Sequence, residues 1–549
     1  MTARPSSDSS DRSDLPEADY IIVGAGSAGC ALANKLTACG RHRVLLIEAG
    51  PVDRHPYVHM PKGMAKLFAD PRHVHSFQTD PSEEVPAETW IRGKVLGGSS
   101  SINGMMYFHG HPEDYNEWER LGARGWGWDN MERVFREIEA PNDAATNEGS
   151  VGPLKTTIAG APTPLTEAFI RAGEQLGVPR VPDLNHAGQE GVGYPARTIH
   201  GGRRQSAATA FLTPILGRSN LQVVTDVEID RILFDGNRAC AVLGRRGNKL
   251  VKFRSKGEII LSAGALSSPQ ILERSGVGPA THLQALGIPV VCDSPGVGEN
   301  LAEHRLLMMQ YALLKPLSDN FQFKGWRLLL NMLKYYLTRT GPMTDGSYQA
   351  GAFVKTNPDF LRPDSEVLMA SYSVAFNVKG MLTTDSSHSI HLFGYPLRPI
   401  SRGSIHIQSA EPDTPPSIRP NYLSEEYDQE VTIALFRLIR RWIAQPALQE
   451  IIGKEILPGS EIQTDEEIIR EFKSTGQAGY HACGTARMGG AGSVLDERLR
   501  VRGVVGLRVA DGSVMPNMVS ANTNGPIMAI GWRAGELILQ DCDQLSSSP

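Results

Sequence analysis

The segment Gly24-Ala25-Gly26-Ser27-Ala28-Gly29 has the glycine spacing of a loop that binds the phosphates of a dinucleotide. Gly24 permits a tight turn, Gly26 lets the backbone approach a pyrophosphate, and Gly29 lets a helix pack closely against a strand. Glu48 follows about twenty residues later, where a carboxylate accepts hydrogen bonds from a ribose. Because a carboxylate repels a 2′-phosphate, these residues favour FAD or NAD over NADP.

The residues around this loop predict the elements that position it. Residues 19–23 are a short run rich in β-branched side chains, as expected for a strand buried on both faces. Residues 30–36 are rich in helix formers, and the apolar run 43–47 ends immediately before Glu48. The pattern predicts a βαβ unit whose helix N-terminus faces the negative charge of the ligand. It does not separate FAD from NAD.

Five later segments make that separation, because they resemble, in order, the signatures of the glucose–methanol–choline (GMC) oxidoreductases, a family of FAD enzymes. The segments are Arg92 to Gly104, Gly264 to Gly278, Pro295 to Leu301, Tyr480 to Gly489 and Asn522 to Pro526. The resemblance extends from about Asp19 to Leu539. It implies an α/β fold in which a Rossmann-like FAD-binding domain carries a discontinuous substrate domain built on an antiparallel sheet.

The resemblance also implies which residues hold the cofactor. Some relatives carry a histidine in the first signature that links covalently to the flavin, and the matching position here is Ile102, so we expect non-covalent FAD. The expected contacts are Gly24, Gly26, Ser27, Ala28, Gly29, Glu48, Ala49, Arg92, Val95, Gly97, Gly98, Ser100, Asn103, Gly104, Met105, Met106, Val227, Ala263, Tyr480, Asp511, Gly512 and Pro526. No metal site is expected, because His109 and His111 form only an incomplete ligand pair.

Oxidation of an alcohol requires a base for the hydroxyl proton and a donor that holds the oxygen. His481 matches the catalytic histidine of the family, and Asn524 is assigned to the second catalytic position, which is His or Asn in relatives. Asn522 is the competitor for that role and is assigned to the turn. Since an amide does not titrate, His481 is expected to be the only base with a near-neutral pKa at the flavin. Some oxidases of the family carry a bulkier residue at the position of Gly479. The glycine is expected either to widen the pocket near the flavin or to loosen control of oxygen access, and both alternatives leave oxidase and dehydrogenase activity open.

The expected reaction is FAD-dependent oxidation of a primary aromatic or furanic alcohol to the aldehyde. Hydride passes to flavin N5, His481 acts as general base, Asn524 holds the substrate oxygen, and electrons pass on to O2 or a quinone-type acceptor. A choline-like cation is less favoured, because no acidic and aromatic cage is apparent. Two alternatives stay open, namely a hydroxynitrile-lyase-like enzyme without net redox chemistry and a non-catalytic flavin-binding scaffold.

The motifs and the composition together predict how the chain is organised. The predicted parts are a disordered leader at 1–17, an FAD-binding domain at 18–148, 192–303 and 477–545, and a substrate domain at 149–191 and 304–476. Alternating apolar residues predict substrate-domain strands within 365–376, 389–397 and 404–409. The apolar run 326–337 is interpreted as a helix with one buried face, too short to cross a bilayer.

The composition excludes several classes of protein. The formal net charge is −5, with 55 basic and 60 acidic residues, so no nucleic-acid partner is expected. Six scattered cysteines indicate neither a disulfide framework nor a zinc site, and a reducing cytoplasm is the simplest compartment. The sequence does not indicate an oligomeric state.

Overall fold

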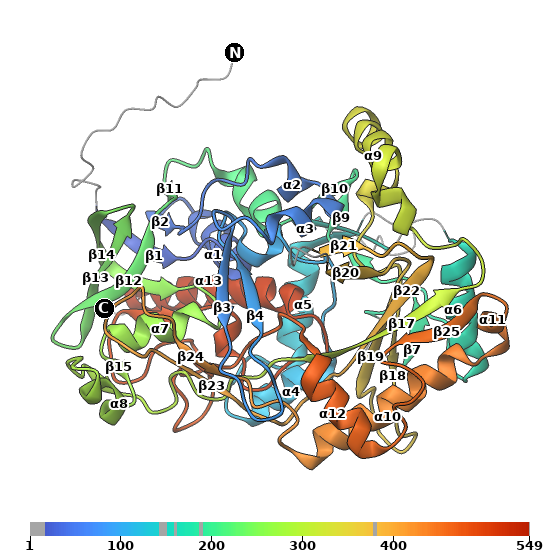
Figure 1. Cartoon of the computed structure of the whole chain (residues 1–549). Coiled ribbons are helices and arrows are strands. Elements are labelled where there is room, and N and C mark those ends of the chain that lie inside the picture. Colours follow the sequence, from blue (N-terminus) through green and yellow to red (C-terminus); the bar gives the residue numbers. More distant parts are fainter. Residues whose placement is uncertain (1–16, 142–150, 159–161, 186–189, 377–381, 548–549) are drawn as a thin grey trace.

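A computed structural model describes residues 17–141, 151–158, 162–185, 190–376 and 382–547. The predicted leader at 1–17 therefore lies almost wholly outside the described residues. Two β-sheets dominate the described chain, and they stand side by side in Figure 1. The α/β fold and the antiparallel substrate sheet are confirmed. The predicted domain limits stay a prediction.

The first sheet begins with the predicted βαβ unit. Strand β1 (Ala18–Val23) pairs in parallel with β2 (Val44–Ile47) and with β14 (Lys249–Leu261). Parallel neighbours extend this sheet at both sides, namely β11 (Leu221–Val224) beside β2 and β27 (Leu507–Val509) beside β14. The side chains of β1, β2 and the last three residues of β14 are almost all apolar and buried, as expected for central strands of a parallel sheet that is covered on both faces. An antiparallel extension follows, formed by β12 (Glu228–Asp235) and β13 (Arg238–Arg246).

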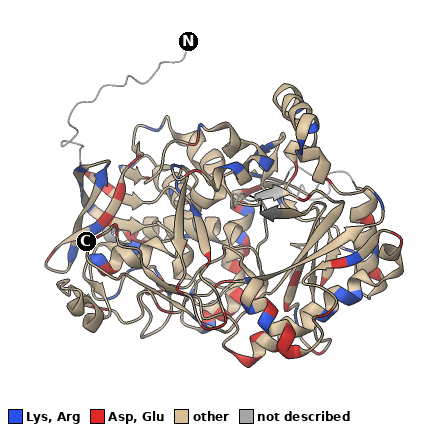
Figure 2. Ribbon diagram, viewed as in Figure 1, with Lys and Arg blue, Asp and Glu red and all other residues tan. Residues whose placement is uncertain are grey.

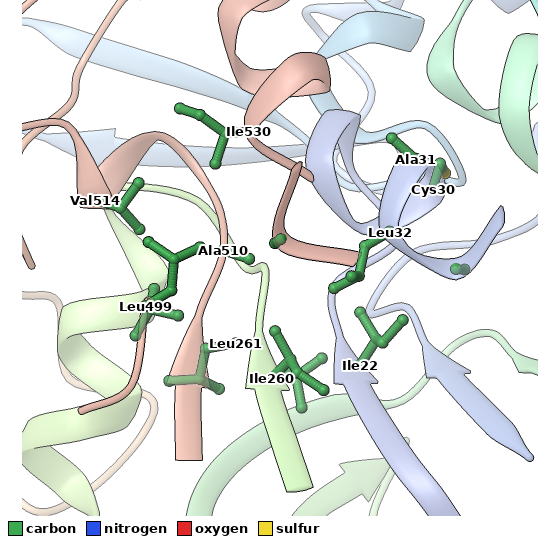
Figure 3. Close-up of a cluster of buried hydrophobic side chains, with 14 of the residues drawn as sticks. Ile22, Cys30, Ala31, Leu32, Ile260, Leu261, Leu499, Ala510, Val514 and Ile530 are labelled. Carbon is green, nitrogen blue, oxygen red and sulfur yellow. The ribbon is translucent and has the colours of Figure 1, made fainter. Parts of the chain in front are cut away.

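Helices α1 (Ser27–Thr37) and α13 (Asn524–Ser547) pack together over this sheet. Figure 3 shows part of this core, with Leu32 of α1 near Ile22 and Ile260 of the strands, and Ile530 of α13 on the side of Val514 and Ala510. Both helices begin near the carboxyl ends of the central strands. Their N-termini therefore lie at the edge of the sheet where a ligand binds in folds of this kind.

The second sheet is antiparallel and has the order β25-β17-β22-β19-β18-β7. Helices pack on one face of it, where Leu435 and Ile439 of α10 and Phe169 of α6 join the core with strand residues such as Leu392. The bounds are β17 (Arg305–Leu313), β22 (Ser389–Pro396), β19 (Ser365–Ala370), β18 (Ala350–Val354), β25 (Ile452–Leu457), β7 (Gly191–Gly193), α6 (Pro164–Gln175), α10 (Glu426–Ile443) and α12 (Asp465–Thr475).

Two of the predicted strands differ from the structure. The run 365–376 divides into β19 and β20 (Val374–Phe376), and within the described part of the chain β20 forms a two-stranded sheet with β21 (Leu382–Thr384). The run 404–409 supplies β23 (Ser404–His406), which pairs with β24 (Ser417–Arg419) outside the large sheet. Alternation of apolar residues predicts that a strand exists, but it does not identify its partner.

Shorter elements connect the two sheets. They are α2 (Pro56–His59), α3 (Met64–Leu67), β3 (Val74–Gln78), β4 (Thr89–Gly93), α4 (Pro112–Arg120), α5 (Trp128–Ile138), β5 (Glu139–Pro141), β6 (Leu154–Ile158), β8 (Ala196–Arg197), β9 (Ile199–His200), β10 (Arg203–Arg204), α7 (Ser267–Arg274), β15 (Val277–Gly278), α8 (Ala280–Ala285), β16 (Cys292–Asp293), α9 (Gly325–Thr338), α11 (Pro446–Gln449) and β26 (Gln477–Ala478).

Helix α9 projects from the rest of the molecule in Figure 1. Tyr335 is its one fully buried residue, so the face predicted to be buried is only partly covered. Among the described residues, no helix combines the length and the apolar character that crossing a membrane requires.

Candidate active site

A cavity of about 2000 Å³ extends from Glu48 in the first sheet to His481 beside the second. The strand ends of both sheets contribute to its wall, together with the N-termini of α1 and α13. It is large enough for a dinucleotide with space for a small substrate at one end. The end of the cavity at Glu48 is called the nucleotide end, and the end at His481 is called the reaction end.

Close backbone approaches shape the nucleotide end. A Cβ atom added to Gly24 would lie 2.4 Å from the carbonyl oxygen of Ser262, and one added to Gly98 would lie 2.7 Å from the Cα of Gly26. Both residues also have positive φ angles, of 104° and 53°. Glycine is therefore required at these two positions, where neighbouring backbone segments come closest together beside the cavity. The exposed backbone N–H groups of such a wall can bind a pyrophosphate.

Glu48 lines the cavity, and its carboxylate also holds the glycine loop. One oxygen accepts a hydrogen bond of 2.9 Å from the backbone N–H of Ala25, and the other accepts one of 2.9 Å from Gly50. Burial raises the pKa of Glu48 to about 7, although the two backbone donors lower it. The carboxylate is therefore positioned before any ribose is bound.

Most of the residues predicted to contact the cofactor line this cavity. The lining includes Gly24, Gly26, Ser27, Ala28, Glu48, Ala49, Arg92, Gly98, Asn103, Gly104, Met105, Met106, Val227, Ala263, Tyr480, Asp511 and Gly512. It also includes residues that were not predicted as contacts, such as Ser99, Ser262, Gly264 and Ile527.

Five predicted contacts lie outside the wall, and they are Gly29, Val95, Gly97, Ser100 and Pro526. A Cβ atom on Gly29 would lie 1.9 Å from the carbonyl oxygen of Gly24, so this glycine serves the packing of α1 against the loop. The Ser100 hydroxyl accepts a hydrogen bond of 2.8 Å from Ala207 and donates to Gly97. These residues pack behind the residues that line the cavity. Sequence motifs do not distinguish the residues that line a site from those that support it.

Asp511 joins two of the turns that border the cavity. Its Oδ2 accepts hydrogen bonds from the Gly264 backbone and the Ser268 hydroxyl, at 2.8 and 2.6 Å. Its Oδ1 accepts one from the Ser513 backbone at 2.8 Å. The side chain thereby fixes the turn after β14 to the turn after β27, which contains the predicted cofactor contacts Asp511 and Gly512.

At the reaction end, Glu303 holds the backbone of the segment that contains His481. Its carboxylate accepts hydrogen bonds from the backbone N–H groups of His481 and Ala482, at 2.6 and 2.9 Å. Burial raises the pKa of Glu303 to about 7, although the Arg92 guanidinium, 3.5 Å away, lowers it. Tyr480 adopts a φ of 61°, a left-handed conformation that costs energy for a non-glycine residue and is common at functional sites.

The ring of His481 is fixed by a second histidine, His304. The Nε2 atom of His304 lies 3.0 Å from the carbonyl oxygen of Leu397, which can only accept, so Nε2 carries the proton. Burial lowers the pKa of His304 to about 4, so the ring is neutral and its Nδ1 carries a lone pair. His481 Nδ1 therefore donates to His304 Nδ1 across 2.9 Å. As a result, the lone pair of His481 lies on Nε2.

The amide beside His481 belongs to Asn522 and not to Asn524, so the predicted placement of Asn524 is wrong. Asn522 Nδ2 lies 2.9 Å from His481 Nε2. Asn524 is the first residue of α13, and its Oδ1 accepts a hydrogen bond of 2.8 Å from the Ser27 hydroxyl at the start of α1. The side chain of Asn524 is therefore directed toward the glycine loop. Its buried Nδ2 has no partner among the described residues and lies at the cavity wall.

Gly479 lines the cavity, and it also has a steric role beside His481. The expected widening of the pocket stays a prediction. A Cβ atom at this position would lie 2.8 Å from His481 Nδ1, 2.8 Å from Leu306 and 3.1 Å from the Cβ of His304. The absence of a side chain therefore leaves space for the two-histidine contact.

The pKa of His481 also differs from the expected near-neutral value. Burial lowers it well below the ordinary range of histidine, and the neighbouring His304 and Arg92 lower it further. His481 is 8% exposed. In this site the imidazole is neutral at physiological pH, which is the form that can accept a proton.

Three residues that contact His481 were not assigned to the site from the sequence, namely Asn522, Glu303 and His304. Asn522 was considered and assigned to the turn. Glu303 and His304 lie two and three residues after the segment 295–301. An acidic residue beside a histidine, immediately before β17, is the local feature of the sequence that could have identified them. Their role depends on antiparallel pairing with residues 477–483, which lie far away in the chain.

Other histidines satisfy structural contacts. His109 Nε2 lies 2.6 Å from Glu139, and His111 caps the N-terminus of α4, so these two do not converge on one point. Glu273, His282 and His406 lie close enough together to hold an ion. However, both ring nitrogens of His406 already face carboxylates, Glu273 at 2.7 Å and Glu299 at 3.1 Å.

Comparisons with known proteins identify the family of the chain. Two family models, both described as GMC oxidoreductase, match residues 18–306 and 399–531. The alcohol dehydrogenase (acceptor) of Pseudomonas putida is 38% identical over 538 residues, covering 96% of this chain and 97% of the relative. The mitochondrial choline dehydrogenase of Homo sapiens is 38% identical over 535 residues, covering 95% and 90%.

A solved structure shares the fold over almost its whole length. The pyridoxine 4-oxidase from Mesorbium loti superposes with a TM-score of 0.85 at 29% identity, covering 95% of this chain and 99% of that one. With matched family models over most of its length and a cavity that fits the cofactor, the protein is an FAD-binding flavoprotein that belongs to the GMC oxidoreductase family.

Proposed function

We propose that the protein oxidises a primary alcohol to an aldehyde, with His481 as general base and Asn522 as the donor that holds the substrate oxygen. The observation that carries the proposal is the chain of contacts Leu397–His304–His481–Asn522, which presents a lone pair and an amide donor at one end of the cavity. FAD, when bound, accepts the hydride that leaves the alcohol carbon.

The residues at this end can perform the proton transfer. A substrate hydroxyl that replaces the direct 2.9 Å contact between His481 Nε2 and Asn522 Nδ2 would give its proton to the imidazole and accept a hydrogen bond from the amide. The amide donor stabilises the negative charge that develops on oxygen as the proton leaves. Because His481 Nδ1 is already protonated, the incoming proton has one destination, Nε2.

Asn524 is assigned a different role in this proposal. Its free Nδ2 at the start of α13 and its bond to Ser27 place a donor next to the glycine loop. We therefore assign Asn524 to the cofactor. Ile102, which also lines the cavity, has no nucleophilic atom, and this supports non-covalent FAD.

The lining of the reaction end favours an uncharged aromatic or furanic alcohol. Strands and loops of the second sheet contribute rings and apolar chains there, among them Tyr348, Tyr372, Phe393 and Met308. The carboxylate that residues 304–476 contribute to the lining is Asp413, and it lies 3.0 Å from Arg245. A choline-like cation would therefore meet no free carboxylate from this sheet. The acceptor for the electrons is proposed to be O2 or a quinone.

Anaerobic mixing of the holoprotein with a panel of alcohols tests the proposal. We expect benzyl and furfuryl alcohols to bleach the flavin absorbance faster than choline does. The variant Asn522→Ala should reduce the rate about 10²–10³-fold with its FAD content unchanged. Asn524→Ala should release FAD more readily at a smaller cost in rate.

Two results would reject the proposal. A flavin spectrum that no alcohol changes, together with cleavage of a cyanohydrin, would identify a lyase without net redox chemistry. A reduction rate that does not respond to His481→Ala would indicate a flavin-binding scaffold. Reoxidation of the reduced protein with oxygen and with a soluble quinone then identifies the acceptor.

A further inference from the structure

Helix α9 presents an apolar stripe to solvent. Residues spaced at i, i+3, i+4, i+7, i+10 and i+11 form one face of a helix, and in α9 that face is exposed. The stripe comprises Trp326 (68% exposed), Leu329 (70%), Leu330 (51%), Leu333 (54%), Tyr336 (46%) and Leu337 (74%). Apolar residues scattered singly over a surface are ordinary, but a continuous stripe of this kind marks a site of interaction.

The opposite face of α9 anchors the helix to the protein. Tyr335 is buried against Met60 and Met343, and Leu328 and Met332 pack on the same cluster. Leu328, Leu329 and Met332 also line the large cavity. The exposed stripe is therefore continuous with the rim of the cavity that contains His481.

The charged residues within the segment 320–344, which contains α9, have one sign, and Asp319 and Asp345 lie directly outside it. Residues 320–344 include Lys324, Arg327, Lys334 and Arg339 and no acidic residue, whereas the whole chain has a formal charge of −5. The blue segments on the projecting helix in Figure 2 follow this pattern. An apolar stripe with Trp and Leu beside basic residues is the composition of helices that lie in the plane of a lipid interface.

We propose that α9 docks the protein on an anionic bilayer surface, with the stripe inserted among the lipids and the rim of the cavity facing the membrane. The basic residues would meet lipid phosphates, and the apolar stripe would leave water. A second copy of the chain fits less well, because a two-fold contact through α9 would bring the same four basic residues against each other. The inference does not depend on the identity of the substrate.

Co-sedimentation of the FAD-loaded protein with vesicles tests the proposal. One set of vesicles contains phosphatidylcholine alone, and the other contains equal parts of phosphatidylcholine and phosphatidylglycerol. We expect binding to the second set and weak binding to the first. The variant Leu330→Glu/Leu333→Glu should bind more than tenfold more weakly. Neither leucine lines the cavity, so FAD content and flavin reduction should be unchanged.

The matched control is Leu250→Glu/Leu361→Glu, which adds the same charge at two other exposed leucines away from α9, 70% and 100% exposed. It should bind vesicles like the unmodified protein. Arg327→Glu/Lys334→Glu should lose affinity about fivefold or more per residue for anionic vesicles only.

Three outcomes would overturn the proposal. The first is equal binding of the stripe variant and the control, and the second is no binding of the unmodified protein to anionic vesicles. The third is a dimer in solution that the stripe variant converts to a monomer, which would assign the stripe to a second copy of the chain.

Discussion

Removal of the acceptor at His304 is expected to slow flavin reduction without displacing the cofactor. In His304→Leu the side chain still fills the buried space, but nothing accepts the proton on His481 Nδ1. The proton can then move to Nε2, where it occupies the lone pair that the reaction needs. The structure predicts this effect because His304 Nδ1 lies 2.9 Å from His481 Nδ1 and forms the contact that fixes the tautomer.

The magnitude follows from the cost of an unsatisfied buried donor. Leaving one buried N–H without a partner costs about 1–3 kcal/mol. A shift of that size in the tautomer equilibrium of His481 depletes the reactive form about 5- to 150-fold. The rate of flavin reduction should fall by the same factor, within the roughly 10²–10⁴-fold that a general base contributes.

The assay is anaerobic stopped-flow reduction with an alcohol that reduces the unmodified protein. His304→Asn serves as the matched variant, because its Oδ1 can occupy the position of Nδ1 and accept the proton, while the bond to Leu397 is lost. We expect His304→Asn to recover most of the rate that His304→Leu loses. Equal rates for the unmodified protein and His304→Leu, or equal losses in both variants, would refute the assignment of the tautomer.

Three further outcomes are expected. Gly479→Ala should slow reduction about ten- to a hundredfold with FAD retained, measured by stopped flow, because its Cβ atom would lie 2.8 Å from His481 Nδ1. The pKa of His481 is lowered by burial, so the base is neutral above that pKa, and the reduction rate should be flat across neutral pH and fall only in acid, below the ordinary pKa range of histidine, as a pH profile will show. Gly98→Ala should weaken FAD retention on gel filtration about tenfold, since its Cβ atom would lie 2.7 Å from the Gly26 backbone at a φ of 53°; a full complement of FAD would contradict this.

The nucleotide end of the site could be predicted from sequence because its determinants are local. The segment Gly24 to Gly29 lies between a strand and a helix that are adjacent in the chain, and each glycine has a steric reason that depends on near neighbours. Glu48 is at the end of the next strand, so its position follows from the same βαβ unit. A fixed spacing in the sequence thus corresponds to a fixed arrangement in space.

The two asparagines show where that correspondence ends. Asn522 and Asn524 are identical in chemistry and two residues apart, so composition and spacing do not distinguish them. Asn524 is the first residue of α13 and faces Ser27, whereas Asn522 lies before the helix and faces His481. The assignment depends on the residue at which α13 starts, and helix boundaries are the least certain feature of a sequence-based prediction.

The position of His481 depends on contacts with residues that are even more distant in the chain. Glu303 holds the backbone of His481, and His304 holds its ring, and both residues directly precede β17 of the antiparallel sheet. Strand β26 ends three residues before His481 and pairs with the start of β17. Asn522, in contrast, is positioned by the start of α13 on the nucleotide-binding sheet.

The two proposed catalytic residues are therefore supported by different sheets. The distance between His481 Nε2 and Asn522 Nδ2, 2.9 Å here, depends on how the sheets pack together. A substitution that loosens the pairing of β17 with β26 would move the base without touching Asn522 or the glycine loop. It would lower the rate of flavin reduction and leave FAD bound, and this separation of effects is the expected property of a site assembled where two sheets meet.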